Sequence, residues 1–96
     1  MHKIRIPDDV AALLRSLHPN LKRKARAALR ILSTDPYEGK SLQSDLEGLR
    51  SYRIGRFRIV YRISERKDIE VVAVGPRKNI YEETLRLLKK ETKKGT

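Results

Sequence analysis

Residues 49–83, LRSYRIGRFRIVYRISERKDIEVVAVGPRKNIYEE, carry the strongest fold signal of the chain, because this stretch contains three runs that are typical of β-strands. The first two runs flank Gly55-Arg56, and a glycine at the first central position of a two-residue loop favours a type II′ hairpin. A polar turn at residues 65–68 leads into residues 69–74, which are apolar at nearly every position. This last run predicts the central strand of the sheet, ended by Gly75-Pro76.

The second strand of the hairpin alternates between two kinds of side chain. Its predicted core face consists of Phe57, Ile59, Tyr61 and Ile63. Its other face consists of Arg56, Arg58, Val60 and Arg62. Because successive side chains of a strand point to opposite faces, we expect one face to be buried and the other to be cationic and open to a ligand.

Upstream of the hairpin, helical patterns dominate. Residues 2–6 predict a short first strand, and Asp8 is the expected N-cap of the first helix. Apolar side chains at helical spacing predict two helices, the first ending near His18 and the second running from Pro19 to about residue 34. Residues 35–48 predict an ordered loop, and residues 81–88 a last helix with a frayed tail at about 91–96. The expected order is β-α-α-β-β-β-α, an α+β fold.

Size and charge limit what the chain can be. Its 96 residues predict a single domain, residues 1–96, and its formal net charge of +11 predicts an anionic partner, which is nucleic acid, an acidic protein or an anionic membrane. The sequence has no long apolar run and no N-terminal hydrophobic signal, which argues against the membrane and predicts a cytoplasmic protein. Without cysteine it has no disulfide, thiol nucleophile or cysteine-based zinc site.

The arginines of the hairpin have two interpretations. Exposed strands often carry basic residues only to block edge pairing. However, no carboxylate occurs between Leu49 and Ser64, so these cations have no local counter-charge. Holding Arg53, Arg58 and Arg62 together costs electrostatic energy, which a phosphate offsets through bidentate hydrogen bonds.

Two residues beyond the hairpin extend this chemistry. Arg77 follows Gly75-Pro76 at the end of a strand, so its side chain is expected to reach the same face as Arg58. A phosphodiester attacked by a ribose 2′-hydroxyl gathers negative charge that preorganised guanidinium groups stabilise. Tyr81 is the candidate base, because nearby cations favour its phenolate. It is equally open to a role as a core residue of the last helix or as a stacking platform for a nucleobase.

Other chemistries find little support in the sequence. His2 and His18 lack the spaced partners that a metal site or a nucleophilic triad requires. Acidic pairs at the predicted helix starts are explained by capping and by the helix dipole. We therefore expect neither a metal nor a cofactor.

With these residues in place, the chain resembles the RelE/ParE superfamily of bacterial type II toxins over almost its whole length. The matching signature is YRIGRFRIVY at residues 52–61 followed by VGPRKNIY at residues 74–81. The resemblance implies a RelE/ParE toxin-like fold, in which a small antiparallel sheet packs on the N-terminal two-helix hairpin. It also implies a basic groove along the outer face of that sheet.

The RelE branch of the superfamily implies a specific activity. RelE-like toxins are mRNA interferases that enter the ribosomal A site, cut mRNA by 2′-hydroxyl attack and so inhibit translation. Carried over by motif, the implied catalytic residues are Arg53, Arg58, Arg77 and Tyr81. The further RNA-binding residues expected on this basis are Arg50, Arg56, Arg62 and Lys78. One departure is that the lysine of well-known RelE-like toxins falls here near Ser51 or Arg50, and Arg50 is the expected substitute.

The resemblance also implies partners and alternatives. The partners are a cognate antitoxin protein that neutralises the basic groove, the ribosome and mRNA. In the ParE branch the target is instead DNA gyrase, and the basic-plus-tyrosine site is generally lacking, so Arg77 together with Tyr81 favours the endoribonuclease. A third interpretation is a non-catalytic basic module that binds RNA or an acidic protein.

Overall fold

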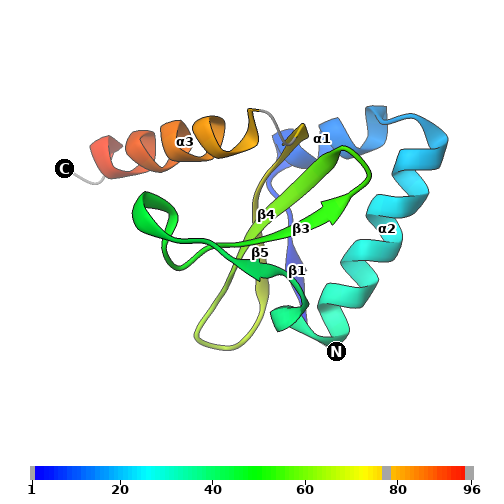
Figure 1. The fold of residues 1–96 in the computed structure, drawn as a ribbon, viewed down its shortest axis with the longest axis horizontal. Coiled ribbons are helices and arrows are strands. Elements are labelled where there is room, and N and C mark those ends of the chain that lie inside the picture. Colours follow the sequence, from blue (N-terminus) through cyan, green and yellow to red (C-terminus); the bar gives the residue numbers. More distant parts are fainter. Residues whose placement is uncertain (1, 77–78, 95–96) are drawn as a thin grey trace.

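The computed structural model describes residues 2–76 and 79–94, with the side chains of residues 2–76 and 79–89. Figure 1 shows a central sheet with two helices on one side and the last helix on the other. The helices are α1 (Asp8–Ser16), α2 (Pro19–Thr34) and α3 (Ile80–Lys94). The strands are β1 (Ile4–Arg5), β2 (Lys40–Ser41), β3 (Arg50–Ile54), β4 (Phe57–Ile63) and β5 (Ile69–Pro76). The predicted α+β class is confirmed.

The sheet is mixed rather than purely antiparallel. Its order is β1-β5-β4-β3-β2, with β1 parallel to β5 and the other neighbours antiparallel. The predicted first strand is reduced to two residues, and β5 lies inside the sheet while β4 holds the middle position. The expected loop at residues 35–48 contains two short 3₁₀ turns, Pro36–Glu38 and Ser44–Leu46, on either side of β2. Strands as short as β1 and β2 carry no periodicity, so only their neighbours define them.

The β3–β4 hairpin forms as the sequence predicts. Gly55 has a φ of +60° and Arg56 does not have a positive φ, which agrees with the expected type II′ turn. The ladder pairs Arg53 with Arg58 and Ser51 with Val60. One face of the sheet therefore carries these four side chains, and the opposite face carries Tyr52 and its ladder partner Ile59.

The helical hairpin covers the apolar face of the sheet. Pro19 starts α2, where its missing N–H and fixed φ suit the first turn, and α2 ends at Thr34 as expected. Asp8 is not the N-cap of α1 but lies in its first turn, where its charge favours the helix dipole, and Pro7 precedes it. The first core cluster joins the helices to the sheet and contains Val10, Ala25, Ala28, Leu32, Ile54, Ile59, Tyr61, Ile69, Val71 and Val74.

The second face of the sheet is only partly open, which corrects the expectation of a fully exposed cationic face. A second core cluster lies there and contains Leu49, Val60, Ala73 and Ile80. Val60 and Ile80 are both fully buried, because α3 packs across β5 and β4. The α3 helix also continues to Lys94, further than the sequence pattern predicted. The basic side chains on this face, such as Arg53 and Arg58, consequently lie beside a buried apolar cluster rather than on a fully open surface.

Candidate functional site

A cleft of about 460 Å³ opens where β2, β4 and the first turn of α3 meet. Its lining consists of Lys40, Ser41, Leu42, Gln43, Arg58 and Tyr81. Two of the predicted catalytic residues, Arg58 and Tyr81, thus lie in one cleft although they come from different elements. The cleft combines a guanidinium, an ammonium and a phenol, which together suit an anionic ligand that carries an aromatic base.

Ser51 joins the two predicted catalytic side chains. The Tyr81 hydroxyl donates a hydrogen bond to Ser51 Oγ at 3.4 Å, and Arg58 Nη1 donates to the same oxygen at 3.3 Å. Ser51 is only 2% exposed, so this shared acceptor is held firmly by the sheet. The buried Ser51 hydroxyl therefore fixes the position of Tyr81, the candidate base, relative to Arg58, the candidate group for stabilising the transition state.

Strand register and the packing of α3 explain this meeting. Ser51 is paired with Val60, so it lies on the same face as Arg58, two residues before Val60 in β4. Ile80 seats the start of α3 on β5, since a Cβ added to Gly75 would lie 3.1 Å from Ile80 Cδ1. The absence of a side chain at residue 75 lets α3 approach closely, and this brings Tyr81 over Ser51.

Arg53 and Arg56 accompany Arg58 at the exposed end of the hairpin. Arg53 is the direct ladder partner of Arg58, and its Nε donates to the Gly55 carbonyl oxygen at 3.1 Å. Arg56 is exposed in the turn. Arg58 is half-buried, and its Nε is buried without a hydrogen-bond partner in the described part of the chain. Like charges this close together favour an anion between them.

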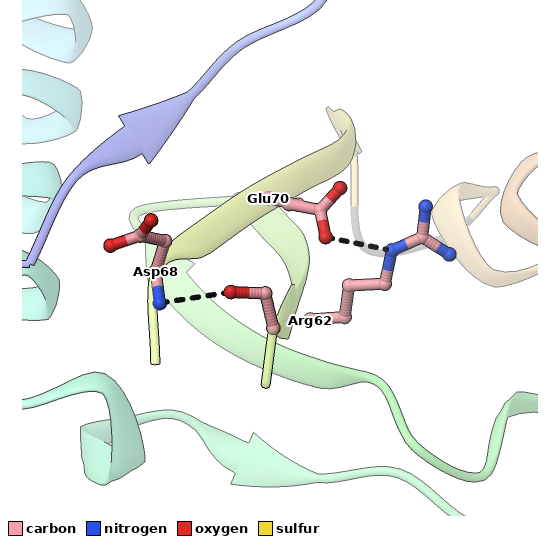
Figure 2. Close-up of polar contacts among 4 residues, drawn as sticks. Arg62, Asp68 and Glu70 are labelled. Atoms are coloured by element: carbon pink, nitrogen blue, oxygen red, sulfur yellow. Dashed lines mark hydrogen bonds and ion pairs between the residues drawn. The ribbon is translucent and has the colours of Figure 1, made fainter. Parts of the chain in front are cut away.

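Arg62 differs from the other hairpin arginines because it has an acidic partner. Figure 2 shows its side chain facing Glu70 from the adjacent strand, with Arg62 Nε 3.7 Å from Glu70 Oε1. The two residues are direct ladder partners in β4 and β5. The expectation of uncompensated charge along the whole strand is therefore wrong at Arg62, because a carboxylate distant in sequence becomes a neighbour in the sheet.

Arg50 lies on the opposite face of the sheet from Arg58. Its ladder partner is Tyr61, and its Nη2 donates to the carbonyl oxygens of Tyr37 at 3.0 Å and Gly39 at 2.6 Å. Its guanidinium also lies 5.3 Å from the centroid of the Tyr37 ring. Arg50 thus holds the segment before β2 in place, and the structure does not bring it to the cleft as a substitute for a catalytic lysine.

Tyr61 shows how a structural tyrosine differs from Tyr81. Its buried hydroxyl donates to the Pro36 carbonyl oxygen at 2.6 Å and accepts from the Gly39 N–H at 3.0 Å. Burial raises the pKa of Tyr61, partly offset by the Gly39 hydrogen bond and by Arg50. Tyr61 is a core residue, as its position in the strand predicts, whereas Tyr81 is partly exposed and lines the cleft.

Arg77 and Lys78 lie outside the described residues, so their predicted roles remain predictions. Sequence reasoning missed Ser51 as the shared hydrogen-bond acceptor of Arg58 and Tyr81, and it missed Lys40 as a residue of the cleft. Ser51 is a single small polar residue, which is a weak signal, and only the strand pairing places it on the face of Arg58. Lys40 belongs to a two-residue strand without a pattern. In the described part of the chain, no three His, Cys, Asp or Glu side chains group as metal ligands. No helix there is long and apolar enough to cross a membrane.

Comparison with known proteins finds a family model and several solved structures to which the chain is similar. A family model described as the ParE toxin of type II toxin–antitoxin system, parDE, matches residues 5–81. The toxin–antitoxin complex RelBE2 from Mycobacterium tuberculosis contains a similar chain, with 28% identity and a TM-score of 0.69 over 79% of this chain and 98% of that one. Comparison with curated protein sequences gives no match.

Two further solved structures share the fold. The RelE–RelB complex from the archaeon Pyrococcus horikoshii is similar with 24% identity and a TM-score of 0.65, over 79% of this chain and 94% of that one. A double mutant of the Escherichia coli toxin RelE in the free state gives 16% identity and a TM-score of 0.73, over 94% of this chain and 96% of that one. At these identities the two similarities demonstrate the fold alone.

Proposed function

Since the chain belongs to the family of ParE toxins of type II toxin–antitoxin systems, within the RelE/ParE superfamily, we propose that it is a ribosome-dependent endoribonuclease that cuts mRNA in the A site. The observation that carries this proposal is the convergence of Arg58 and Tyr81 on the buried hydroxyl of Ser51. A toxin that acted only by covering its target would not need a phenol and a guanidinium held on one atom at the edge of a cleft. Because its substrate is translated mRNA, we place its action in the cytoplasm.

In the proposed reaction, the ribose 2′-hydroxyl attacks the adjacent phosphorus atom. Tyr81 takes the proton from that hydroxyl, and Arg58 stabilises the charge that develops on the non-bridging oxygens. Arg53 and Arg77 add positive charge around the same phosphate. The exposed Arg56, together with Lys78, contacts the RNA backbone. Arg50 and Arg62, each with a partner inside the protein, contribute less to RNA binding.

Cleavage mapping on translating ribosomes tests the proposal. Wild-type protein is compared with Arg58→Ala, with Arg77→Ala and with a ribosome-free reaction. Arg30→Ala is the matched control, since Arg30 is exposed on α2, a helix of the opposite face. We expect cuts within the A-site codon that require the ribosome, Arg58 and Arg77 but not Arg30. If the folded wild-type protein makes no such cuts, the proposal that it is an endoribonuclease is wrong.

DNA gyrase is a second candidate target, favoured by one observation. The family model that matches this chain is described as the toxin of parDE systems, and the ParE branch is expected to act on gyrase. Inhibition of purified gyrase by the wild-type protein, without any mRNA cleavage, would favour this candidate. The Tyr81→Phe variant distinguishes a non-catalytic binding module from the endoribonuclease. A protein that only binds should keep its effect on growth after losing that hydroxyl.

A cognate antitoxin is the expected partner, since the similar structure from M. tuberculosis is a toxin–antitoxin complex and that from P. horikoshii is a RelE–RelB complex. The net charge of +11 and the cations around the cleft favour an acidic segment that neutralises them. Counterion release then makes the association weaken steeply as salt is raised. Titration of the antitoxin against the toxin at two or more salt concentrations measures this slope, and binding insensitive to salt would contradict an electrostatic interface.

A further inference from the structure

The proposed cleavage needs a group that Arg58 and Tyr81 do not supply. When the bond from phosphorus to the 5′-oxygen breaks, that oxygen leaves as an alkoxide unless it receives a proton. A guanidinium stays protonated in proteins, so Arg58 can stabilise charge but is a poor acid, and Tyr81 is already the base. Building on the proposed function, we propose that Lys40 is a further catalytic residue, which donates the proton to the leaving 5′-oxygen.

Strand register puts Lys40 beside the catalytic pair. In the antiparallel pairing of β2 and β3, Lys40 lies directly opposite Ser51, the residue on which Arg58 and Tyr81 converge. Directly opposite residues point to the same face with Cβ atoms about 5 Å apart. Lys40 is exposed and lines the cleft together with Arg58 and Tyr81. Its ammonium is therefore within reach of a phosphodiester bound between them.

The chemistry of the other cleft residues singles out Lys40. Ser41 and Gln43 carry neutral groups that are much weaker acids than an ammonium, and Leu42 carries no exchangeable side-chain proton. Among the described side chains that line the cleft, Lys40 is the one that carries an ammonium group. A lysine also has a flexible stem with three rotatable donors, which suits following an oxygen that moves away from phosphorus.

The residue before Lys40, Gly39, is held by hydrogen bonds at both its N–H and its carbonyl oxygen. The Gly39 N–H donates to the Tyr61 hydroxyl at 3.0 Å, and the Gly39 carbonyl oxygen accepts from Arg50 Nη2 at 2.6 Å. Gly39 and Tyr61 are buried. The two contacts fix where β2 begins, so Lys40 projects from a defined point although β2 is only two residues long. Arg50 thereby acts through the backbone as a positioning residue rather than at the phosphate.

The step balances in atoms and charge. The reacting form has Tyr81 as the phenolate and Lys40 as the ammonium: the 2′-oxygen forms a bond to phosphorus and gives its proton to the Tyr81 phenolate, while the bond to the 5′-oxygen breaks and that oxygen takes a proton from the Lys40 ammonium. The products are a 2′,3′-cyclic phosphate and a 5′-hydroxyl. Tyr81 ends protonated and Lys40 ends neutral, and exchange with water restores both groups.

A modified substrate distinguishes two possible roles of Lys40, which are donating a proton and supplying positive charge. In mRNA with sulfur in place of the 5′-bridging oxygen at the A-site cut, the leaving thiolate needs no proton. We expect Lys40→Ala to slow cleavage of normal mRNA about 100-fold and to cleave the sulfur substrate at nearly the wild-type rate. Lys40→Arg keeps the charge but not the usable proton, so it should behave like Lys40→Ala on normal mRNA and like wild type on the sulfur substrate.

Lys24→Ala is the matched control, because Lys24 is an exposed lysine of α2, away from the cleft. It should cleave both substrates at the wild-type rate. Two results would show that Lys40 is not the proton donor while leaving the proposed function in place. In the first, Lys40→Ala cleaves normal mRNA as fast as wild type. In the second, Lys40→Ala is equally slow on both substrates although its circular dichroism spectrum and melting temperature are unchanged. If the wild-type protein cleaves neither substrate, the proposed function fails and the role of Lys40 fails with it.

Discussion

The Tyr81 hydroxyl donates a hydrogen bond to the hydroxyl of Ser51 at 3.4 Å, although the two residues lie 30 positions apart in the chain. Arg58 donates to the same oxygen. Because Ser51 is buried in β3, it sets the position of both side chains relative to the sheet. The candidate site therefore depends on a residue that contributes no chemistry of its own.

Replacing Ser51 with alanine should impair cleavage more than folding. The change removes the shared acceptor, so Tyr81 and Arg58 lose their common reference point, and misplacement of catalytic groups costs roughly 10- to 100-fold in rate. The free energy of unfolding should fall by only about 1 kcal/mol, because one hydrogen-bonding side chain is lost. Single-turnover cleavage rates and urea melts measure the two effects. Ser16→Ala, on α1, is the control that should leave the rate unchanged.

Replacing Arg58 with alanine should abolish toxicity and keep the folded state. The Arg58 side chain lies at the edge of a cleft, its Nε has no hydrogen-bond partner among the described groups, and its loss leaves the two core clusters intact. Growth after induction and the thermal melt of the purified protein test both parts. If Arg58→Ala fails to fold, Arg58 is a structural residue, and the charge-stabilising role assigned to it is wrong.

Tyr61→Phe should destabilise the protein by about 1–3 kcal/mol. The Tyr61 hydroxyl satisfies the Pro36 carbonyl and the Gly39 N–H, and its removal leaves two polar groups of buried residues unpaired. Denaturant unfolding of the variant measures the cost. Tyr37→Phe is the matched control, since Tyr37 is 56% exposed and its ring, which Arg50 contacts, is retained. An equal loss in both variants would contradict the assigned role of the Tyr61 hydroxyl.

The stability conferred by Tyr61 should decline above about pH 10. Burial raises the pKa of Tyr61 in the folded state, so the unfolded chain ionises first as the pH rises. Below the ordinary value of about 10 both states keep the proton and the full stability is present, and it is lost as the pH rises through the folded-state pKa. The difference in unfolding free energy between wild type and Tyr61→Phe, measured from pH 8 to 11, should therefore shrink at the alkaline end. A constant difference would show that Tyr61 does not titrate differently on folding.

Gly39→Ala should destabilise the protein and slow cleavage together. A Cβ at residue 39 would lie 2.8 Å from Tyr61 Cε1, so the ring or the backbone must shift, at a cost of about 1–3 kcal/mol. The shift moves the start of β2 and hence Lys40. A thermal melt and a cleavage assay at a temperature where the variant is folded measure both consequences. If the variant is destabilised but cleaves mRNA at the wild-type rate, the anchoring of Gly39 does not position Lys40.

The elements that could be predicted are those whose own residues carry a period or a turn signal. The hairpin around Gly55, the start of α2 at Pro19 and the burial of Tyr61 could be predicted because alternation, fixed φ angles and side-chain volume act locally. The basic character of the chain and the choice of Arg58 and Tyr81 as candidates also follow from residue type and spacing, together with the family resemblance.

Which of these residues meet could not be predicted, because it depends on contacts between distant segments. The parallel pairing of β1 with β5, the two-residue strand β2, and the packing of α3 over Val60 all arise from contacts between distant segments, for which a single sequence has no signal. Strand register then separates residues that are adjacent in the chain: Arg50 lies on the same face as Tyr61 and contacts Tyr37 and Gly39, whereas Ser51 contacts Arg58 and Tyr81 on the other face. A shift of one residue in a strand reverses every side chain, so the pairing of strands, and not the composition of β3, made Ser51 and Lys40 part of the candidate site.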